Sequence, residues 1–181
     1  MKDKKIIIKP STIIIIFSIV LILINILLFY LRLTMPVIDQ DEYIGSAKEF
    51  AGIGISKVRS AHSWVYGWFL GQILKIFSFL PYLLTIKIIN SLWLILDIIL
   101  LYKITKDKRI LILWMFSPIV WFMSTGVSPI LPASFLLLLA YSSLKSYEEN
   151  KKKKDFILSS LSLGLSAALW GPAILISIFF M

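Results

Sequence analysis

The segment that decides the fold begins Met35-Pro-Val-Ile-Asp-Gln-Asp-Glu-Tyr43 and continues to Leu80. It is the only long segment that is not plainly apolar, and apolar runs punctuated by lysine clusters lie on both sides of it. It contains the single histidine, His62, and four of the ten acidic residues, which are Asp39, Asp41, Glu42 and Glu49. We therefore expect the apolar runs to form a scaffold and residues 35–80 to form the site.

The composition of the chain is that of a membrane protein. Hydrophobic residues make up 59% of the 181 residues, and the mean hydropathy is +0.89, whereas a soluble domain is about half apolar. Several apolar runs reach or approach the roughly 20 residues that a helix needs to cross a bilayer. The sequence therefore predicts an all-α, polytopic membrane protein with one transmembrane domain over residues 1–181. The lack of cysteine excludes disulfides and cysteine-based zinc sites.

The positive charge of the chain is distributed as in membrane proteins rather than as in nucleic-acid-binding proteins. The net charge is +9, but the lysines cluster beside apolar runs, in residues 2–9, 103–109 and 145–154. Such clusters are typical of cytoplasmic loops and of contact with anionic lipid headgroups. We therefore exclude nucleic acid as a partner and expect a cytoplasmic amino terminus, in either a cell membrane or the endoplasmic reticulum membrane.

Five membrane-spanning segments are predicted, with residues 35–80 as an outer loop between the first two. The first apolar run is too long for the core of a secretory signal, and no small-x-small cleavage site follows it. The last run reaches Met181 without a polar tail, so a truncated chain is as good an interpretation as a complete one. The predicted spans are residues 11–31, 83–102, 110–123, 130–144 and 156–181.

Residues 63–80 predict an amphipathic helix that lies flat in the membrane interface. The helix has one face rich in tryptophan, isoleucine and phenylalanine, which is typical of interfacial helices. The alternative is a spanning helix that uses its small residues for packing. A flat helix keeps both basic loops on the side of the lysine-rich amino terminus, so the positive-inside rule favours it. The opposite, small or polar face consists of Ser63, Gly67, Gly71, Lys75 and Ser78.

The acidic residues Asp39, Asp41 and Glu42 form a dense cluster just after the first predicted span. Three uses are open for them: solvated loop acids, oxygen ligands of a divalent cation such as Mg or Mn, or a general base that accepts a proton from a hydroxyl. Asp41 and Glu42 are adjacent in a short helix predicted over residues 41–51. Their side chains would point about 100° apart, so only one of them would face a reaction.

Basic residues flank the predicted interfacial helix. Arg59 and His62 precede it, and Lys75 lies on its small or polar face. Basic groups at headgroup depth suit a phosphate, which arginine can bind through two hydrogen bonds. The alternative is plain contact with lipid headgroups, and we favour that alternative for Lys75 taken alone.

Three polar side chains fall within the predicted span 83–102. Asp97 lies near the inner end of the span, and we expect it to meet Lys103 or Lys106. Asn90 is expected to form an interhelical hydrogen bond. Lys87 is expected to extend its ammonium group outward to the interface.

Short motifs in the outer loop resemble those of a known superfamily. Asp41-Glu42-Tyr43 with Ala47 and Lys48, then His62-Ser63-Trp64 with Tyr66-Gly67, and finally Ser117-Pro118 follow in this order. They resemble the amino-terminal part of the GT-C superfamily of integral-membrane glycosyltransferases. Protein O-mannosyltransferases and aminoarabinose transferases are the members that the layout is most similar to.

The resemblance implies a glycosyltransferase, such as a mannosyltransferase, that moves a sugar from a polyprenyl-phosphate donor to an acceptor hydroxyl on the outer face. Asp41 would be the catalytic base, and Glu42 would orient the site. The residues that would bind the substrate or its phosphate are Asp39, Lys48, Arg59, His62, Tyr66 and Lys75.

The chain also departs from the pattern of that superfamily. Its members often carry an acid where this chain has Ser124–Ser128, and a lysine where it has Trp170-Gly171-Pro172. The rival interpretation is therefore a non-catalytic or truncated membrane protein that binds lipid or a membrane partner subunit.

Overall fold

The structure, a computed structural model, describes residues 9–31, 40–54 and 64–178. Within these residues the chain forms nine helices and no strand. The helices are α1 (Pro10–Tyr30), α2 (Gln40–Ala51), α3 (Trp64–Ile76), α4 (Tyr82–Thr105), α5 (Lys108–Met115), α6 (Pro118–Thr125), α7 (Ile130–Asn150), α8 (Lys153–Leu169) and α9 (Ala173–Ile178).

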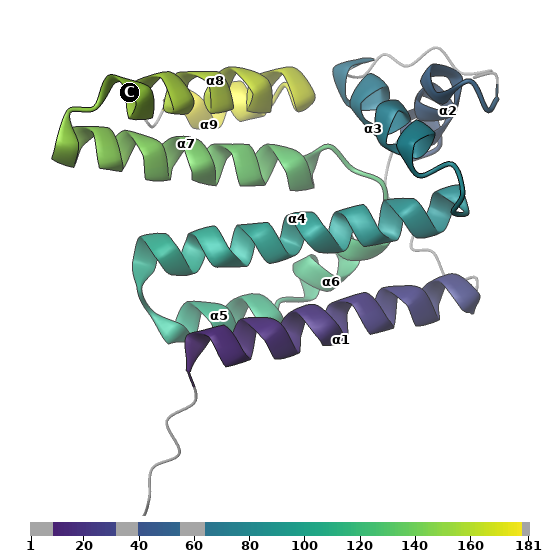
Figure 1. The fold of residues 1–181 in the computed structure, drawn as a ribbon, viewed down its shortest axis with the longest axis horizontal. Coiled ribbons are helices and arrows are strands. Elements are labelled where there is room, and N and C mark those ends of the chain that lie inside the picture. Colours follow the sequence, from purple (N-terminus) through teal and green to yellow (C-terminus); the bar gives the residue numbers. More distant parts are fainter. Residues whose placement is uncertain (1–8, 32–39, 55–63, 179–181) are drawn as a thin grey trace, which may run out of the picture.

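The long helices lie side by side and run back and forth between two ends of the molecule (Figure 1). Helix α4 packs between α1 and α7, α8 packs against α7, and α5 and α6 pack against α1 and α4. The start of α1, the α4–α5 connection and the α7–α8 connection share one end, which we call the lysine-rich end. Helices α2 and α3 pair at the opposite end, which we call the α2–α3 end.

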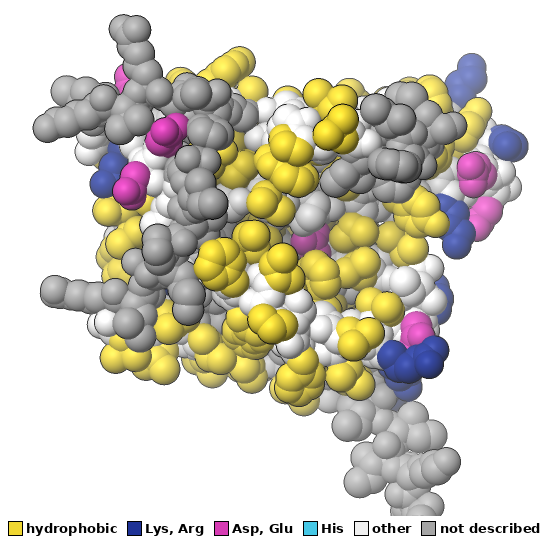
Figure 2. All heavy atoms as spheres, turned by 180° about the vertical axis from the view of Figure 1, so that it is seen from behind, with side chains coloured by type: hydrophobic (Ala, Val, Ile, Leu, Met, Phe, Trp, Pro, Cys, Tyr) yellow, Lys and Arg dark blue, Asp and Glu magenta, His cyan; other side chains and the backbone are white. Residues whose placement is uncertain are grey.

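Three of the described helices, α1, α4 and α7, are long and apolar enough to cross a membrane. Much of the apolar surface of α1 is exposed, and Figure 2 shows a broad apolar band between the two ends of the molecule. Exposed apolar side chains are compatible with a lipid bilayer around the bundle. The prediction of an all-helical chain with membrane-spanning helices is confirmed at this level, whereas the count of five spans is not.

Two of the predicted spans each contain a break in the helix. Residues 110–123 fall on α5 and α6, because Pro118 has no backbone N–H and holds Ser117 in an extended conformation. The described part of residues 156–181 falls on α8 and α9, which are separated at residues 170–172. Helices α4 and α7 are instead longer than predicted, and each ends at a lysine with a positive φ, Lys106 or Lys151.

The α2–α3 pair corrects our interpretation of the glycine face of residues 63–80. Gly67 and Gly71 are buried against α2 instead of forming part of a polar face. A Cβ atom on Gly71 would lie 2.6 Å from Cβ of Phe50 and 2.8 Å from the carbonyl oxygen of Ala47. The glycines therefore serve close helix packing, as in the alternative that we left open, but on a helix of 13 residues.

The apolar core consists of two clusters of buried side chains. At the α2–α3 end, Tyr43 and Ala47 of α2 pack with Tyr66 and Leu70 of α3. The second cluster lies within the bundle and contains side chains from five helices. Its buried residues are Phe17, Leu21, Leu94, Ile98, Leu111, Val120 and Leu131. Because the first cluster also contains Ile86 of α4, the α2–α3 pair is attached to the bundle through apolar contacts.

Candidate functional site

The first turn of α2 carries the two predicted catalytic acids. Asp41 is exposed, whereas Glu42 is half-buried. Carboxylates in this position are stabilised by the positive end of the helix dipole. Asp41 is the more open of the two carboxylates, and which of them would face a reaction stays a prediction.

Three predicted site residues, Asp39, Arg59 and His62, lie outside the described residues. Among the residues that the structure describes, no three acidic, histidine or cysteine side chains come together as a metal site. Binding of a divalent cation therefore stays a prediction, as does the role of these three residues.

Two predicted phosphate-binding lysines lie on the α2–α3 pair. Lys48 of α2 is half-buried, and its Nζ lies 3.9 Å from the centroid of the Tyr82 ring at the start of α4. Such a cation–π contact holds the ammonium group near the joint between the pair and the bundle. Lys75 is exposed in the last turn of α3. The structure thus leaves both ammonium groups at the α2–α3 end.

Tyr66 is part of the core rather than of an open surface. It is 2% exposed, and its ring meets that of Tyr43 edge to face at a centroid distance of 5.1 Å. Burial raises the pKa of Tyr66, the nearby Tyr43 raises it further, and a hydrogen bond from the backbone of Ser128 opposes both. The phenol is therefore protonated at neutral pH, and contact between Tyr66 and a substrate would require rearrangement of the pair.

The α6–α7 turn is fastened to the α2–α3 end by polar side chains. The backbone N–H of Val127 donates to Oε1 of Gln40, over 3.3 Å. Asn90 of α4 donates from Nδ2 to the carbonyl oxygens of Gly126 and Ser124. These bonds confirm the predicted interhelical role of Asn90, and they fix the turn beside the first turn of α2.

Lys87 is a candidate that sequence reasoning placed wrongly. Its side chain is only 2% exposed instead of reaching outward, and its Nζ donates to the carbonyl oxygen of Thr125 over 3.5 Å. No carboxylate of the described residues pairs with it. A buried ammonium group with one long hydrogen bond has donor capacity left for an anion. The signal in the sequence was a lysine inside an apolar run.

Asp97 is the second buried ionisable residue on α4, and its predicted partners were also wrong. It is fully buried, and its Oδ2 accepts a hydrogen bond of 2.7 Å from the hydroxyl of Ser134 on α7. Its Oδ1 has no partner among the described residues. Lys103 and Lys106 are exposed at the lysine-rich end and do not pair with it. Asp97 therefore links α4 to α7 inside the bundle.

The fold and this end of the molecule define a class: an all-helical protein, with three helices able to cross a membrane, that carries an acid-bearing helix pair at one end. No protein-family model, no curated protein and no solved structure matches the chain. The class therefore stands on the chain's own residues.

Proposed function

We propose that the chain is a membrane glycosyltransferase that moves a sugar from a polyprenyl-phosphate donor to an acceptor hydroxyl at the α2–α3 end. The observation that carries the proposal is the exposed Asp41 in the first turn of α2, at the end of the bundle opposite the lysine-rich end. A carboxylate in this position is open to a hydroxyl from solution, and the cations Lys48 and Lys87 belong to the same end of the molecule.

The proposed topology has five membrane crossings: α1, α4, α5 with α6, α7 and α8. Support for α8 as a crossing comes from its side chains, because serines face α7 while leucines and isoleucines are exposed. This is the reverse of the pattern of a helix in a water-soluble protein. Ser159 and Ser166 each donate to a backbone carbonyl of α7, over 2.9 Å. Small polar residues between helices and apolar residues outside are typical of membrane helices.

Helix α3 is proposed to lie in the interface rather than to cross. Its 13 residues span about 20 Å, whereas the apolar core of a bilayer is about 30 Å thick. The exposed side of α3 carries Trp64 and Trp68, which are 67% and 47% exposed. Tryptophan is enriched at headgroup depth, so this face is suited to the membrane surface.

In the proposed reaction, Asp41 accepts the proton of the acceptor hydroxyl while the hydroxyl oxygen attacks the anomeric carbon of the sugar. The bond between that carbon and the phosphate oxygen breaks, and polyprenyl phosphate leaves with the bonding electrons. Lys48 and Lys75 supply positive charge for the phosphate as its negative charge grows, and the buried Lys87 adds to the positive potential at this end. Glu42 lies next to Asp41 and orients the site.

The test is a transfer assay with the purified full chain in phospholipid micelles. Radiolabelled polyprenyl-phosphate mannose is the donor, and a peptide rich in serine and threonine is the acceptor. Label appearing in the peptide, and lost when Asp41 is replaced, supports the proposal. If the chain binds the donor without transferring the sugar, and replacing Asp41 does not change that binding, a non-catalytic lipid-binding protein is favoured instead.

The proposed topology predicts a pattern of cysteine labelling, since the chain has no cysteine of its own. Glu49, Thr105 and Lys152 are exposed, so a cysteine at each is accessible to a membrane-impermeant maleimide. In sealed cells we expect labelling of Glu49→Cys and protection of Thr105→Cys and Lys152→Cys. Labelling of all three from outside, with cell integrity verified on a cytoplasmic protein, contradicts five crossings.

Replacing Lys87 by methionine separates its proposed phosphate role from a structural one. A buried charge without a carboxylate partner carries a desolvation cost, which an apolar side chain of similar volume removes. We therefore expect Lys87→Met to keep the thermal stability of the chain and to weaken donor binding about tenfold, measured by titration with polyprenyl phosphate. A loss of stability with unchanged donor affinity would show that Lys87 serves only the fold.

A further inference from the structure

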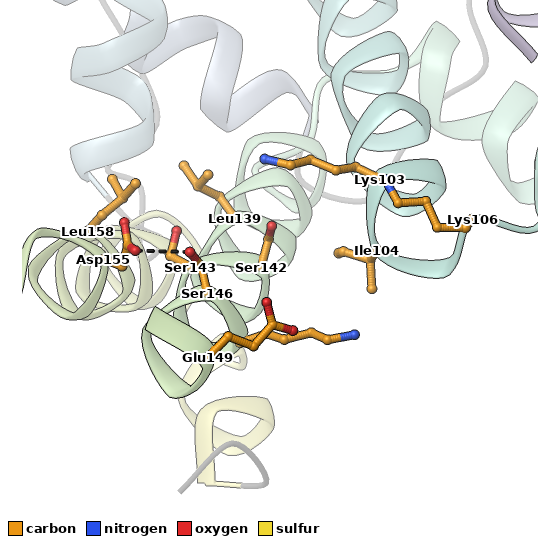
Figure 3. A pocket seen from close by; sticks show the side chains of 11 residues that line it. Lys103, Ile104, Lys106, Leu139, Ser142, Ser143, Ser146, Glu149, Asp155 and Leu158 are labelled. Atoms are coloured by element: carbon orange, nitrogen blue, oxygen red, sulfur yellow. Dashed lines mark hydrogen bonds between the residues drawn. The ribbon is translucent and has the colours of Figure 1, made fainter. Parts of the chain in front are cut away.

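A pocket of about 460 Å³ opens at the lysine-rich end, between the end of α4 and the α7–α8 hairpin (Figure 3). It lies at the opposite end from Asp41 and takes no part in the proposed sugar transfer. Its walls come from three helices that contribute basic, hydroxyl and apolar side chains. A volume of this size lies in the range of pockets that bind small molecules.

Three lysines give the pocket its charge. Lys103 and Lys106, at the end of α4, extend toward α7 and α8 in Figure 3, and Lys145 of α7 completes the set. In the described part of the chain, none of these three ammonium groups is paired with a carboxylate. They are therefore free to bind an anion from the surrounding medium or membrane.

The two acids of the pocket only partly offset this charge. Asp155 already accepts a 2.9 Å hydrogen bond from the hydroxyl of Ser146, and it sits in the first turn of α8, where the helix dipole stabilises it. Glu149 lies exposed on α7. Three lysines against two acids leave the pocket with a net positive charge.

Hydroxyl and apolar groups complete the chemistry of the pocket. The hydroxyls of Ser142 and Ser143 form no hydrogen bond within the described residues, so both can donate to a phosphate oxygen. Ile104, Leu139 and Leu158 add apolar wall. A free anion gains nothing from such a wall, whereas a phosphate that carries acyl chains does.

We propose that this pocket binds the headgroup of an anionic phospholipid from the leaflet at the lysine-rich end. Basic pockets between membrane helices are suited to such headgroups. The phosphate lies among the ammonium groups of Lys103, Lys106 and Lys145, the hydroxyls of Ser142 and Ser143 donate to it, and the acyl chains continue along the apolar band. The proposal needs the bundle to lie in a bilayer, but not the sugar transfer.

The test counts lipids bound to the purified full chain by native mass spectrometry, during titration with phosphatidylglycerol or phosphatidylcholine. We expect one phosphatidylglycerol to bind at least tenfold more tightly than phosphatidylcholine. The triple variant Lys103→Gln, Lys106→Gln and Lys145→Gln should lose this preference. All three lysines are exposed, so their replacement leaves the fold intact, which circular dichroism verifies.

The matched control is the triple variant Lys152→Gln, Lys153→Gln and Lys154→Gln, which removes the same charge from the same end but outside the pocket. We expect its affinity for phosphatidylglycerol to stay within twofold of that of the original chain. Equal losses in the two triple variants would mean diffuse attraction to lysines and would overturn the proposal.

Two further arms distinguish the source of the phosphate and the role of the pocket. Glu149→Gln removes an acid from the rim and should strengthen phosphatidylglycerol binding severalfold; unchanged or weaker binding counts against the pocket. Inorganic phosphate at millimolar concentration should not displace the lipid. Displacement would identify a free anion as the ligand and overturn the lipid assignment.

Discussion

Replacing Asp41 by asparagine is expected to reduce sugar transfer by a factor of about 10²–10⁴, because this is the usual contribution of a general base. Asparagine has nearly the shape of aspartate and is equally acceptable at the beginning of a helix. Asp41 is exposed, so its replacement leaves no buried group without a partner. Helix α2 should therefore remain folded, and the loss of activity should reside in the rate of transfer rather than in the amount of inserted protein.

Glu49→Gln provides the matched control for this experiment. Glu49 is an exposed acid near the other end of the same helix, and its replacement changes the net charge by the same amount. We expect transfer by this variant to stay within about twofold of that of the original chain. If Asp41→Asn and Glu49→Gln transfer sugar equally well, Asp41 is not the base, and the rival interpretation of a non-catalytic membrane protein becomes the better one.

The general organisation of this chain could be predicted from its sequence because lipid and water impose simple demands. Long apolar runs predict helices, and lysine clusters predict which connections share an end. The structure indeed gathers residues 103–109 and 145–154 at the end where α1 begins. The helix breaks at Pro118 and near Gly171 were harder to predict, because the run of apolar residues continues across each break.

The direction of individual polar side chains could not be predicted in the same way. Lys87 and Asp97 both lie inside an apolar run, and only their neighbours in space decide whether they reach a membrane surface. The turn beside Thr125 and the hydroxyl of Ser134 hold them inside instead. Both partners lie more than thirty residues away in the sequence, so no local pattern could have indicated them.

The contact made by the glycines of α3 could not be predicted from the sequence either. Small residues at steps of four are compatible with a wet face and with a close helix contact, and the sequence contains no information that separates the two. The structure places Gly67 and Gly71 against Ser46, Ala47 and Phe50 of α2. What the period did predict correctly is that these residues share one face.

Replacing Gly71 by valine is expected to push α2 and α3 apart. Even the first added carbon would lie 2.6 Å from Cβ of Phe50 and 2.8 Å from the carbonyl oxygen of Ala47, which is backbone and cannot swing aside. Overpacking of this kind costs about 1–3 kcal/mol. We expect faster proteolysis of the α2–α3 segment and a lower midpoint of thermal unfolding, followed through the fluorescence of the tryptophans on α3.

Gly164→Val on α8 is the control, because a Cβ at Gly164 meets nothing within 4 Å. Valine is a better helix former than glycine, so this variant should be as stable as the original chain or slightly more stable. Equal stability of the two variants would show that α2 and α3 do not pack as described.

The same substitution also connects packing to the proposed function. Gly71 packs against the last turns of α2, whereas Asp41 lies in its first turn. The α2–α3 contact nevertheless fixes the position of the helix that carries Asp41. If Asp41 is the base, Gly71→Val should lower transfer although every proposed catalytic residue is retained, since a small displacement of a catalytic group is costly. If Gly71→Val destabilises the helix pair but leaves transfer unchanged, the α2–α3 contact is not needed for the reaction.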